Sequence, residues 1–226
     1  MIKLVVFDLD DTLYPEIDYV YSGLSVIANY LHSMTNIESD DILNFMKEAF
    51  HQNSSFVFDR TLRHFKLQHL DVQNLIAHYR HHQPKISIKT STYQVLSELK
   101  QKVNLAILSD GNLIVQKNKI ASLDLSTLFD FIVLTDQWGQ EFWKPHRKAF
   151  DYLMESFNLK ANEIIYVGDN PSKDFIFGKT VGIYTVQLLS NGIYKNEDYL
   201  EGVAPSFQIH NLDELFLILD TINHNV

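Results

Sequence analysis

The sequence contains no cysteine among its 226 residues. A disulfide framework, a thiolate zinc or iron–sulfur site and a cysteine nucleophile are therefore excluded, and a reducing compartment is allowed. Glycine (8) and proline (5) are also scarce, while hydrophobic residues make up 46% of the chain. That balance is typical of a folded globular protein with a sizeable core, and it excludes a disordered or fibrous one.

Long apolar runs are missing as well. The opening segment MIKLVVFDLD becomes acidic too soon for the apolar region of a signal peptide. No later stretch approaches the roughly eighteen apolar residues that a membrane-spanning helix needs. We therefore expect a cytoplasmic protein without a membrane partner.

Positive charge is the third shortage. Nineteen Lys and Arg stand against 28 Asp and Glu, a net charge of −9, which argues against nucleic acid as a partner because phosphate contacts need clustered cations. Residues 60–85 are an exception, with one acid, Asp71, and a local charge of +4. Their cations are Arg60, Arg63, Lys66, Arg80 and Lys85.

Five short apolar segments recur along the chain with helical patterns between them. They are residues 3–8 (KLVVFD), 103–110 (VNLAILSD), 131–136 (FIVLTD), 163–169 (EIIYVGD) and 182–187 (GIYTVQ). Nearly continuous apolar runs predict parallel strands that are covered on both faces. The core is therefore expected to be α/β, with ligands outside the carboxyl ends of the strands.

A gap of about ninety residues separates the first two of these strands, far more than one crossover helix requires. Apolar residues at helical spacing fill it, and Ser39 is expected to cap the second of four helices. We predict an all-α cap domain at 16–84, entered after Pro15 and left near Pro84. The α/β core domain then comprises residues 1–15 and 85–226.

Acidic residues follow two of the predicted strands. Asp8, Asp10 and Asp11 come directly after the first, and Asp169 and Asp174 follow the fourth. Clustered carboxylates repel one another unless they share a cation or a proton, so they indicate a divalent metal site. Each group alone also fits an ordinary acidic turn or a helix cap.

Two further strand ends carry groups suited to an anion. Ser109 ends the second strand and precedes Asp110 and Gly111, where a hydroxyl and free backbone N–H groups could hold an oxyanion before a helix. Lys144 stands before the helix expected around Phe150. By themselves these residues also fit a helix cap and a surface lysine.

Together these motifs closely resemble those of the haloacid dehalogenase (HAD) superfamily, in its phosphatase-like branch with a helical cap after the first strand. The motifs are FDLDDT at 7–12, LAILSDG at 105–111, WKP at 143–145 and VGDNPSKD at 167–174. The resemblance implies a Rossmann-like parallel sheet and an enzyme, a phosphoric monoester hydrolase. Its substrate would be a small phosphorylated metabolite, such as a nucleotide or sugar phosphate, and the protein a monomer or homodimer.

The resemblance also assigns roles to the site residues. Asp8 would be the nucleophile that forms an aspartyl-phosphate, and Asp10 the general acid and then the base. Mg²⁺ would lie between the carboxylates of Asp8 and Asp169 and the backbone carbonyl of Asp10, with Asp174 as a direct ligand or one sphere further out. The phosphoryl oxygens would be bound by Ser109, Lys144 and the backbone at Asp110 and Gly111.

Three alternatives remain open. A 2-haloacid dehalogenase has the nucleophilic Asp but lacks the second one, so Asp10 favours phosphate ester hydrolysis. A signalling receiver domain carries its acceptor on the third strand and is about half as long, which the position of Asp8 contradicts. A HAD-like binding protein without catalysis is the third, although every expected catalytic position is filled.

The basic stretch allows a further hypothesis, that Arg60, Arg63 or Arg80 contacts an anionic or polyhydroxylated part of the substrate. For any single one of these residues, a solvated helix face that balances the acidic core is the more common explanation. Adjacent residues do not share a helix face, so His81 and His82 are interpreted as surface histidines rather than metal ligands. Trp138, Trp143, Tyr14 and Tyr19 are candidates for stacking on a substrate ring or for core positions.

Overall fold

The computed structural model describes residues 1–189 and 192–224. In this part of the chain six strands form one parallel sheet in the order β3-β2-β1-β4-β5-β6. The strands are β1 (Leu4–Phe7), β2 (Asn104–Ser109), β3 (Phe131–Leu134), β4 (Ile164–Gly168), β5 (Tyr184–Leu188) and β6 (Phe207–Ile209). β1 is central: Val5 lies opposite Leu105 of β2 and Ile165 of β4.

Helices occupy the connections between the strands. The α-helices of the described residues are α1 (Glu16–Met34), α2 (Ser39–Gln52), α3 (Val57–His64), α4 (Val72–His81), α5 (Thr90–Leu99), α6 (Leu113–Ser122), α7 (Lys148–Phe157), α8 (Phe177–Thr180) and α9 (Leu215–His224). Short 3-10 turns are η1 (Leu125–Thr127), η2 (Thr135–Trp138), η3 (Gln140–Phe142), η4 (Ala161–Glu163), η5 (Leu200–Gly202) and η6 (Leu212–Glu214).

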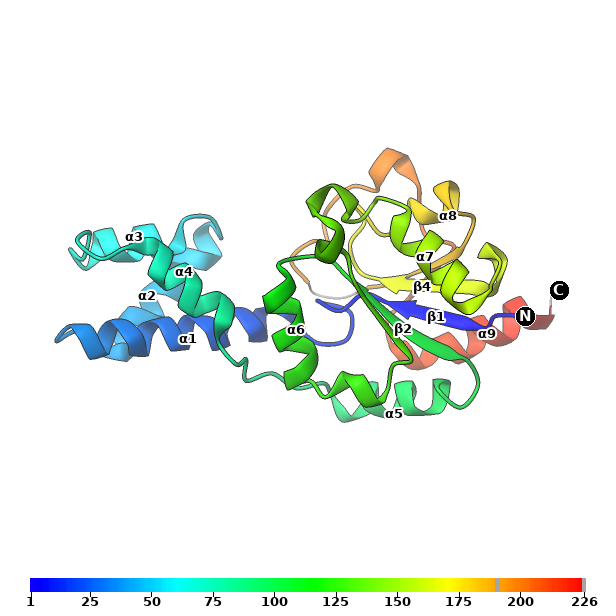
Figure 1. Cartoon of the computed structure of the whole chain (residues 1–226), viewed down its shortest axis with the longest axis horizontal. Coiled ribbons are helices and arrows are strands. Elements are labelled where there is room, and N and C mark those ends of the chain that lie inside the picture. Colours follow the sequence, from blue (N-terminus) through cyan, green and yellow to red (C-terminus); the bar gives the residue numbers. More distant parts are fainter. Residues whose placement is uncertain (190–191, 225–226) are drawn as a thin grey trace.

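The sheet is buried on both faces, which explains why its central strands are apolar throughout. Val5 and Phe7 of β1 face one hydrophobic cluster, to which α5, α6 and α9 contribute. Leu4 and Val6 face the other, which α7 and α8 complete. In Figure 1, α5 and α9 lie on one side of β1, and α7 and α8 on the other. The α/β class and the parallel sheet expected from the sequence are thereby confirmed.

Helices α1–α4 lie between β1 and β2 in the sequence and gather at the end of the molecule away from both termini (Figure 1). They enclose a separate hydrophobic cluster, in which Ile27, Leu31, Ile42 and Met46 are fully buried. The apolar residues at helical spacing in this segment therefore pack the four helices against one another.

Three details differ from the sequence-based expectation. The three-residue strand β6 was not predicted, because so short a segment has little periodicity to detect. Ser39 does not cap α2: the cap position is Glu38, and the Ser39 hydroxyl donates to Asn29 Oδ1 at 2.8 Å. Leu212 belongs to η6 rather than to the closing helix, which begins at Leu215.

Among the described residues, no helix is both long enough and apolar enough to cross a membrane.

Candidate active site

The carboxyl ends of two neighbouring strands bring the predicted acidic residues together. The Asp8 N–H donates to the Val167 carbonyl at 2.8 Å, which extends the pairing of β1 with β4. Carboxylate oxygens of Asp8, Asp169 and Asp174 lie within 4.8 Å of one another. All three residues are buried. The pairing of β1 with β4 thus closes a sequence separation of more than 160 residues between Asp8 and Asp169.

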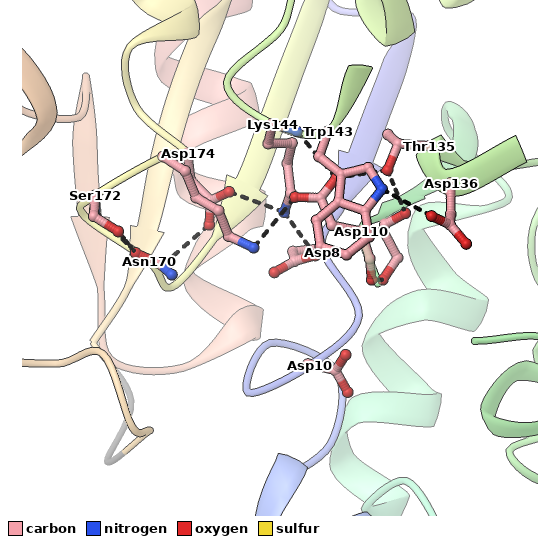
Figure 2. A network of polar contacts seen from close by, with 12 residues as sticks. Asp8, Asp10, Asp110, Thr135, Asp136, Trp143, Lys144, Asn170, Ser172 and Asp174 are labelled. Atoms are coloured by element: carbon pink, nitrogen blue, oxygen red, sulfur yellow. Dashed lines mark hydrogen bonds and ion pairs between the residues drawn. The ribbon is translucent and has the colours of Figure 1, made fainter. Parts of the chain in front are cut away.

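Lys144 lies between Asp8 and Asp174 of this cluster, as Figure 2 shows. Its Nζ lies 2.9 Å from Asp8 Oδ1 and 3.0 Å from Asp174 Oδ1, and it donates to the Tyr166 hydroxyl at 2.7 Å. Burial alone would lower the pKa of Lys144, but Asp174 and Asp8 raise it well above its ordinary value. The lysine is therefore a permanent cation beside the Asp8 carboxylate.

Asp174 is fixed by bonds to both of its oxygens. Oδ1 also accepts a hydrogen bond from the Tyr166 hydroxyl at 3.0 Å, and Oδ2 accepts one from the Asn170 N–H at 3.0 Å. Gly168 allows this close approach, because a Cβ there would lie 2.5 Å from Asp174 Oδ2. The glycine of the VGDNPSKD motif is thus required by the carboxylate that packs against it.

The acidic cluster brings three carboxylates together beside the ammonium of Lys144. Burial, followed by the charges of Asp8 and Asp174, raises the pKa of Asp169 to about 9. Burial likewise raises the pKa of Asp8 to about 6, although Lys144 opposes the shift. Asp169 Oδ2 is buried and has no hydrogen-bond partner among the described residues. Carboxylate oxygens are the ligands that a small divalent cation such as Mg²⁺ prefers, and Asp169 Oδ2 is free to bind one.

Asp10 lies outside this cluster, on the chain that leads from β1 toward α1 (Figure 2). Lys119 Nζ contacts both of its carboxylate oxygens, at 2.7 and 2.8 Å. The Tyr14 hydroxyl donates to Oδ1 at 2.6 Å, and Gln116 Nε2 donates to Oδ2 at 3.0 Å. Burial alone would raise the pKa of Asp10, but the ammonium and these donors hold it below its ordinary value.

The end of β2 supplies the third predicted group. Ser109 is buried, and the Asp110 carboxylate accepts hydrogen bonds from the Thr135 hydroxyl (2.7 Å) and from the Lys144 N–H (3.0 Å). Asp110 therefore connects the ends of β2 and β3 to the segment that carries Lys144. Gly111 has a φ of 108°, and a Cβ there would lie 2.8 Å from Gln116 Nε2, so a side chain would disturb the contact with Asp10.

These groups surround a cavity of about 180 Å³. It is lined by Asp8, Asp10, Glu16, Ser109, Asp110, Gly111, Gln116, Trp143, Asp169, Asn170, Lys173 and Tyr194. Pockets that hold drug-sized ligands have volumes of about 300–1,000 Å³, so this cavity fits a small molecule. Of the predicted site residues, Lys144 and Asp174 lie behind the lining residues, next to Asp8.

The basic stretch does not reach this cavity. Arg60, Arg63 and Arg80 are absent from the lining residues. The Arg60 guanidinium instead donates to backbone carbonyls, at 2.7 Å to Ala49 and 3.0 Å to Ser55, and so anchors the end of α2. In this arrangement Arg60 supports the helical segment and does not face a ligand in the cavity.

Several aromatic and histidine positions are structural. His82 is buried, contrary to the sequence-based interpretation, and its Nδ1 lies 2.6 Å from the Tyr79 carbonyl. Tyr19 packs edge-on against Tyr79 at 5.5 Å between ring centroids. Of the four stacking candidates only Trp143 lines the cavity. The expectation that His82 lies on the surface was wrong. Helix α4 ends at His81, so His82 no longer follows the helix and its side chain is buried.

Sequence reasoning missed the residues that surround Asp10. Gln116 and Lys119 are three positions apart in α6 and share its buried face with Ile120. The sequence did contain a signal for these residues: two polar side chains share a helix face with apolar ones, directly after a candidate site. Asp11, left without a role, accepts hydrogen bonds from the Glu16 N–H (2.9 Å) and the Ile193 N–H (3.2 Å). It fixes the beginning of α1 against the loop after β5.

The fold and the site define an α/β enzyme whose acidic and basic side chains meet at the carboxyl edge of a parallel sheet. The sequence pattern of the haloacid dehalogenase-like hydrolases matches residues 5–188. The chain belongs to this family of hydrolases, as its four motifs predicted.

Similar proteins are known from other organisms. The glyceraldehyde 3-phosphate phosphatase of Methanocaldococcus jannaschii is 28% identical over 230 residues, covering 98% of this chain and 99% of that protein. The pyrophosphatase PpaX of Bacillus anthracis is 26% identical over 237 residues, covering 99% of each. The magnesium-bound structure of the HAD-hydrolase YfnB from Bacillus subtilis is similar in fold, with a TM-score of 0.65 at 19% identity, covering 97% of this chain and 99% of that one.

Proposed function

We propose that the protein is a Mg²⁺-dependent phosphatase that hydrolyses a small phosphorylated metabolite through an aspartyl-phosphate on Asp8. The observation that carries the proposal is the position of Asp8: its carboxylate lines the small cavity, contacts the Lys144 ammonium and lies beside the unsatisfied Asp169. Curated relatives with phosphatase names at 26–28% identity over nearly the whole chain support the same reaction.

Asp8 and Asp169 would hold the metal ion, together with the Asp10 backbone carbonyl and with Asp174 at the edge of the cluster. Bound there, Mg²⁺ would offset the repulsion between the Asp8 carboxylate and a phosphate dianion. Lys144 supplies a fixed positive charge at the same carboxylate, while Ser109 and the backbone of Asp110 and Gly111 offer donors for phosphoryl oxygens.

The reaction would take place in two steps. In the first, an Asp8 oxygen attacks phosphorus, the bond from phosphorus to the leaving oxygen breaks, and Asp10 donates a proton to that oxygen. In the second, Asp10 takes a proton from water, the water oxygen attacks phosphorus, and the bond to Asp8 breaks to release phosphate. Positioning and charge account for most of the rate in such transfers.

Asp10 is ionised in the arrangement described, because the charge of Lys119 and the hydrogen bonds from Lys119, Tyr14 and Gln116 lower its pKa. This is the form that accepts a proton from water in the second step. The negative charge of a bound phosphate ester raises the pKa of a nearby carboxyl group, and so favours the protonated form that the first step needs.

The other possibilities fit the site less well. A 2-haloacid dehalogenase needs no acid for its halide leaving group, whereas here four bonds from three residues position Asp10. A non-catalytic protein would not need a lysine buried against Asp8. We also propose that residues 16–84 act as a cap domain over the core of residues 1–15 and 85–226, since α1 begins only eight residues after Asp8.

The experiment is an assay of phosphate release from a panel of phosphorylated metabolites and p-nitrophenyl phosphate, with and without Mg²⁺. Asp8→Asn is the test variant, and Asp18→Asn, which changes an exposed acid of α1, is the matched control. We expect Mg²⁺-dependent turnover that Asp8→Asn abolishes and Asp18→Asn retains. Turnover by Asp8→Asn at the rate of the unmodified protein contradicts the proposal.

A further inference from the structure

The lining of the cavity also includes an acidic residue from α1. Glu16, the first residue of α1, is the one residue of the described range 16–84 that lines this cavity. Its side chain is 25% exposed to solvent. In the proposed reaction the phosphoryl group is held at Asp8 and Ser109 of the core, so a leaving group that extends from it toward α1 meets the Glu16 carboxylate.

The cations nearby are already engaged by other carboxylates. Among the described lining residues, Lys173 alone carries a cationic side chain, and its Nζ lies 3.3 Å from Asp110 Oδ2. Lys119 is held by both oxygens of Asp10 and lies 3.9 Å from Glu16 Oε1. Two carboxylates around one ammonium leave a net negative charge at Asp10 and Glu16 when both groups are ionised.

Burial and the neighbouring Asp10 raise the pKa of Glu16 to about 7, although Lys119 opposes the shift. A further anion beside Glu16 therefore costs free energy, whether it is repelled by the carboxylate or forces that group to take up a proton. A cation or a hydroxyl group has no such penalty, because the carboxylate accepts a hydrogen bond from either.

We infer that Glu16 selects the leaving group by charge: the enzyme accepts phosphate esters whose leaving group is a neutral alcohol or carries an amine, and discriminates against leaving groups that carry a carboxylate or a second phosphate. The inference rests on the proposed phosphatase function and deepens it. Inorganic pyrophosphate belongs to the disfavoured class, since its leaving group is itself an anion.

Three esters with the same two-carbon chain isolate the charge. They are 2-phosphoglycolate, 2-hydroxyethyl phosphate and phosphoethanolamine, whose far ends are a carboxylate, a hydroxyl group and an ammonium. With Mg²⁺, we expect kcat/KM for the carboxylate ester to be at least about tenfold below that for the hydroxyl ester. A tenfold difference corresponds to about 1.4 kcal/mol. Glu16→Gln keeps the shape and removes the charge, so it should reduce this ratio to within about threefold.

Asp18→Asn removes the same charge two residues further along the first turn of α1, where the side chain is exposed and outside the cavity, and should leave the ratio unchanged. Equal kcat/KM for the carboxylate and hydroxyl esters overturns the inference, and so does a ratio that Glu16→Gln leaves as it was.

Binding separates this inference from the proposed function. Dissociation constants of the three esters for Mg²⁺-loaded Asp8→Asn, measured by calorimetry, should follow the same order of charge. Ordered binding without turnover by the unmodified protein supports the charge selection and contradicts the phosphatase proposal. Turnover without charge order overturns the selection alone, and failure to bind any of the esters overturns both.

Discussion

Lys119 Nζ contacts both carboxylate oxygens of Asp10, at 2.7 and 2.8 Å, from a side chain that is only 2% exposed. The lysine also lies 4.4 Å from the centre of the Tyr19 ring of α1. It therefore joins α6 of the core, the loop after β1 and the first helix of residues 16–84. An ion pair at this junction fixes the carboxylate that we assign to proton transfer.

Replacement of Lys119 by Met should lower kcat more than it changes KM, by about tenfold or more, because the Asp10 carboxylate loses its fixed orientation. Lys119→Arg keeps the charge and should restore part of the loss. Steady-state kinetics with one alkyl phosphate tests this prediction. Equal kcat for Lys119→Met and the unmodified protein would contradict the role of Lys119 in orienting Asp10.

Replacement of Asp10 by Asn should affect esters according to their leaving group. Alkyl phosphates, whose alkoxide needs a proton, should lose about 10²–10⁴ in kcat/KM. p-Nitrophenyl phosphate has a stable leaving anion, so its loss should be much smaller under single-turnover conditions, where aspartyl-phosphate formation is observed alone. Equal losses for both ester types would count against Asp10 as the general acid.

Binding of Mg²⁺ should release protons. In the metal-free protein Asp169, with a pKa of about 9, holds a proton at neutral pH, and the metal binds only the carboxylate. The affinity for Mg²⁺ should therefore rise with pH up to about 9. Calorimetry at pH 7 in buffers of different ionisation enthalpy measures the proton count, which we expect to approach one per ion. An affinity that stays constant from pH 6 to pH 9 contradicts the buried position of Asp169.

Replacement of Lys144 by Met should destabilise the protein strongly, because Asp8 and Asp174 lose their shared cation while they remain buried. Removing one partner of a buried ion pair costs about 3–5 kcal/mol. The matched control is Lys179→Met, whose ion pair with Glu201 is exposed and should contribute no more than about 1 kcal/mol. Urea unfolding curves measure both, and equal changes would contradict the account.

Much of the fold was predictable because its signals are local. The apolar runs of β1 and β4 reflect strands buried on both faces, and Asp8 and Asp169 follow them directly. Strand ends of a parallel sheet meet at one edge, so the grouping of these acids could be predicted without coordinates.

The surroundings of Asp10 were not predictable in the same way. Whether Lys119 lies in solvent or against a carboxylate depends on how α6 packs on the loop after β1, which no periodicity reports. His82 illustrates the same limit, because its burial follows from the residue at which α4 ends. The burial and contacts of such side chains depend on long-range packing and not on their neighbours in the sequence.

The central claim is that the phosphoryl group passes through Asp8, and acid-quenched mass spectrometry of the enzyme during turnover with Mg²⁺ tests it most directly. We predict one phosphoryl group on the peptide that contains Asp8, lost on treatment with hydroxylamine and absent from Asp8→Asn, which should also lack turnover. A phosphoryl group on another peptide, or full turnover by Asp8→Asn, would contradict the claim.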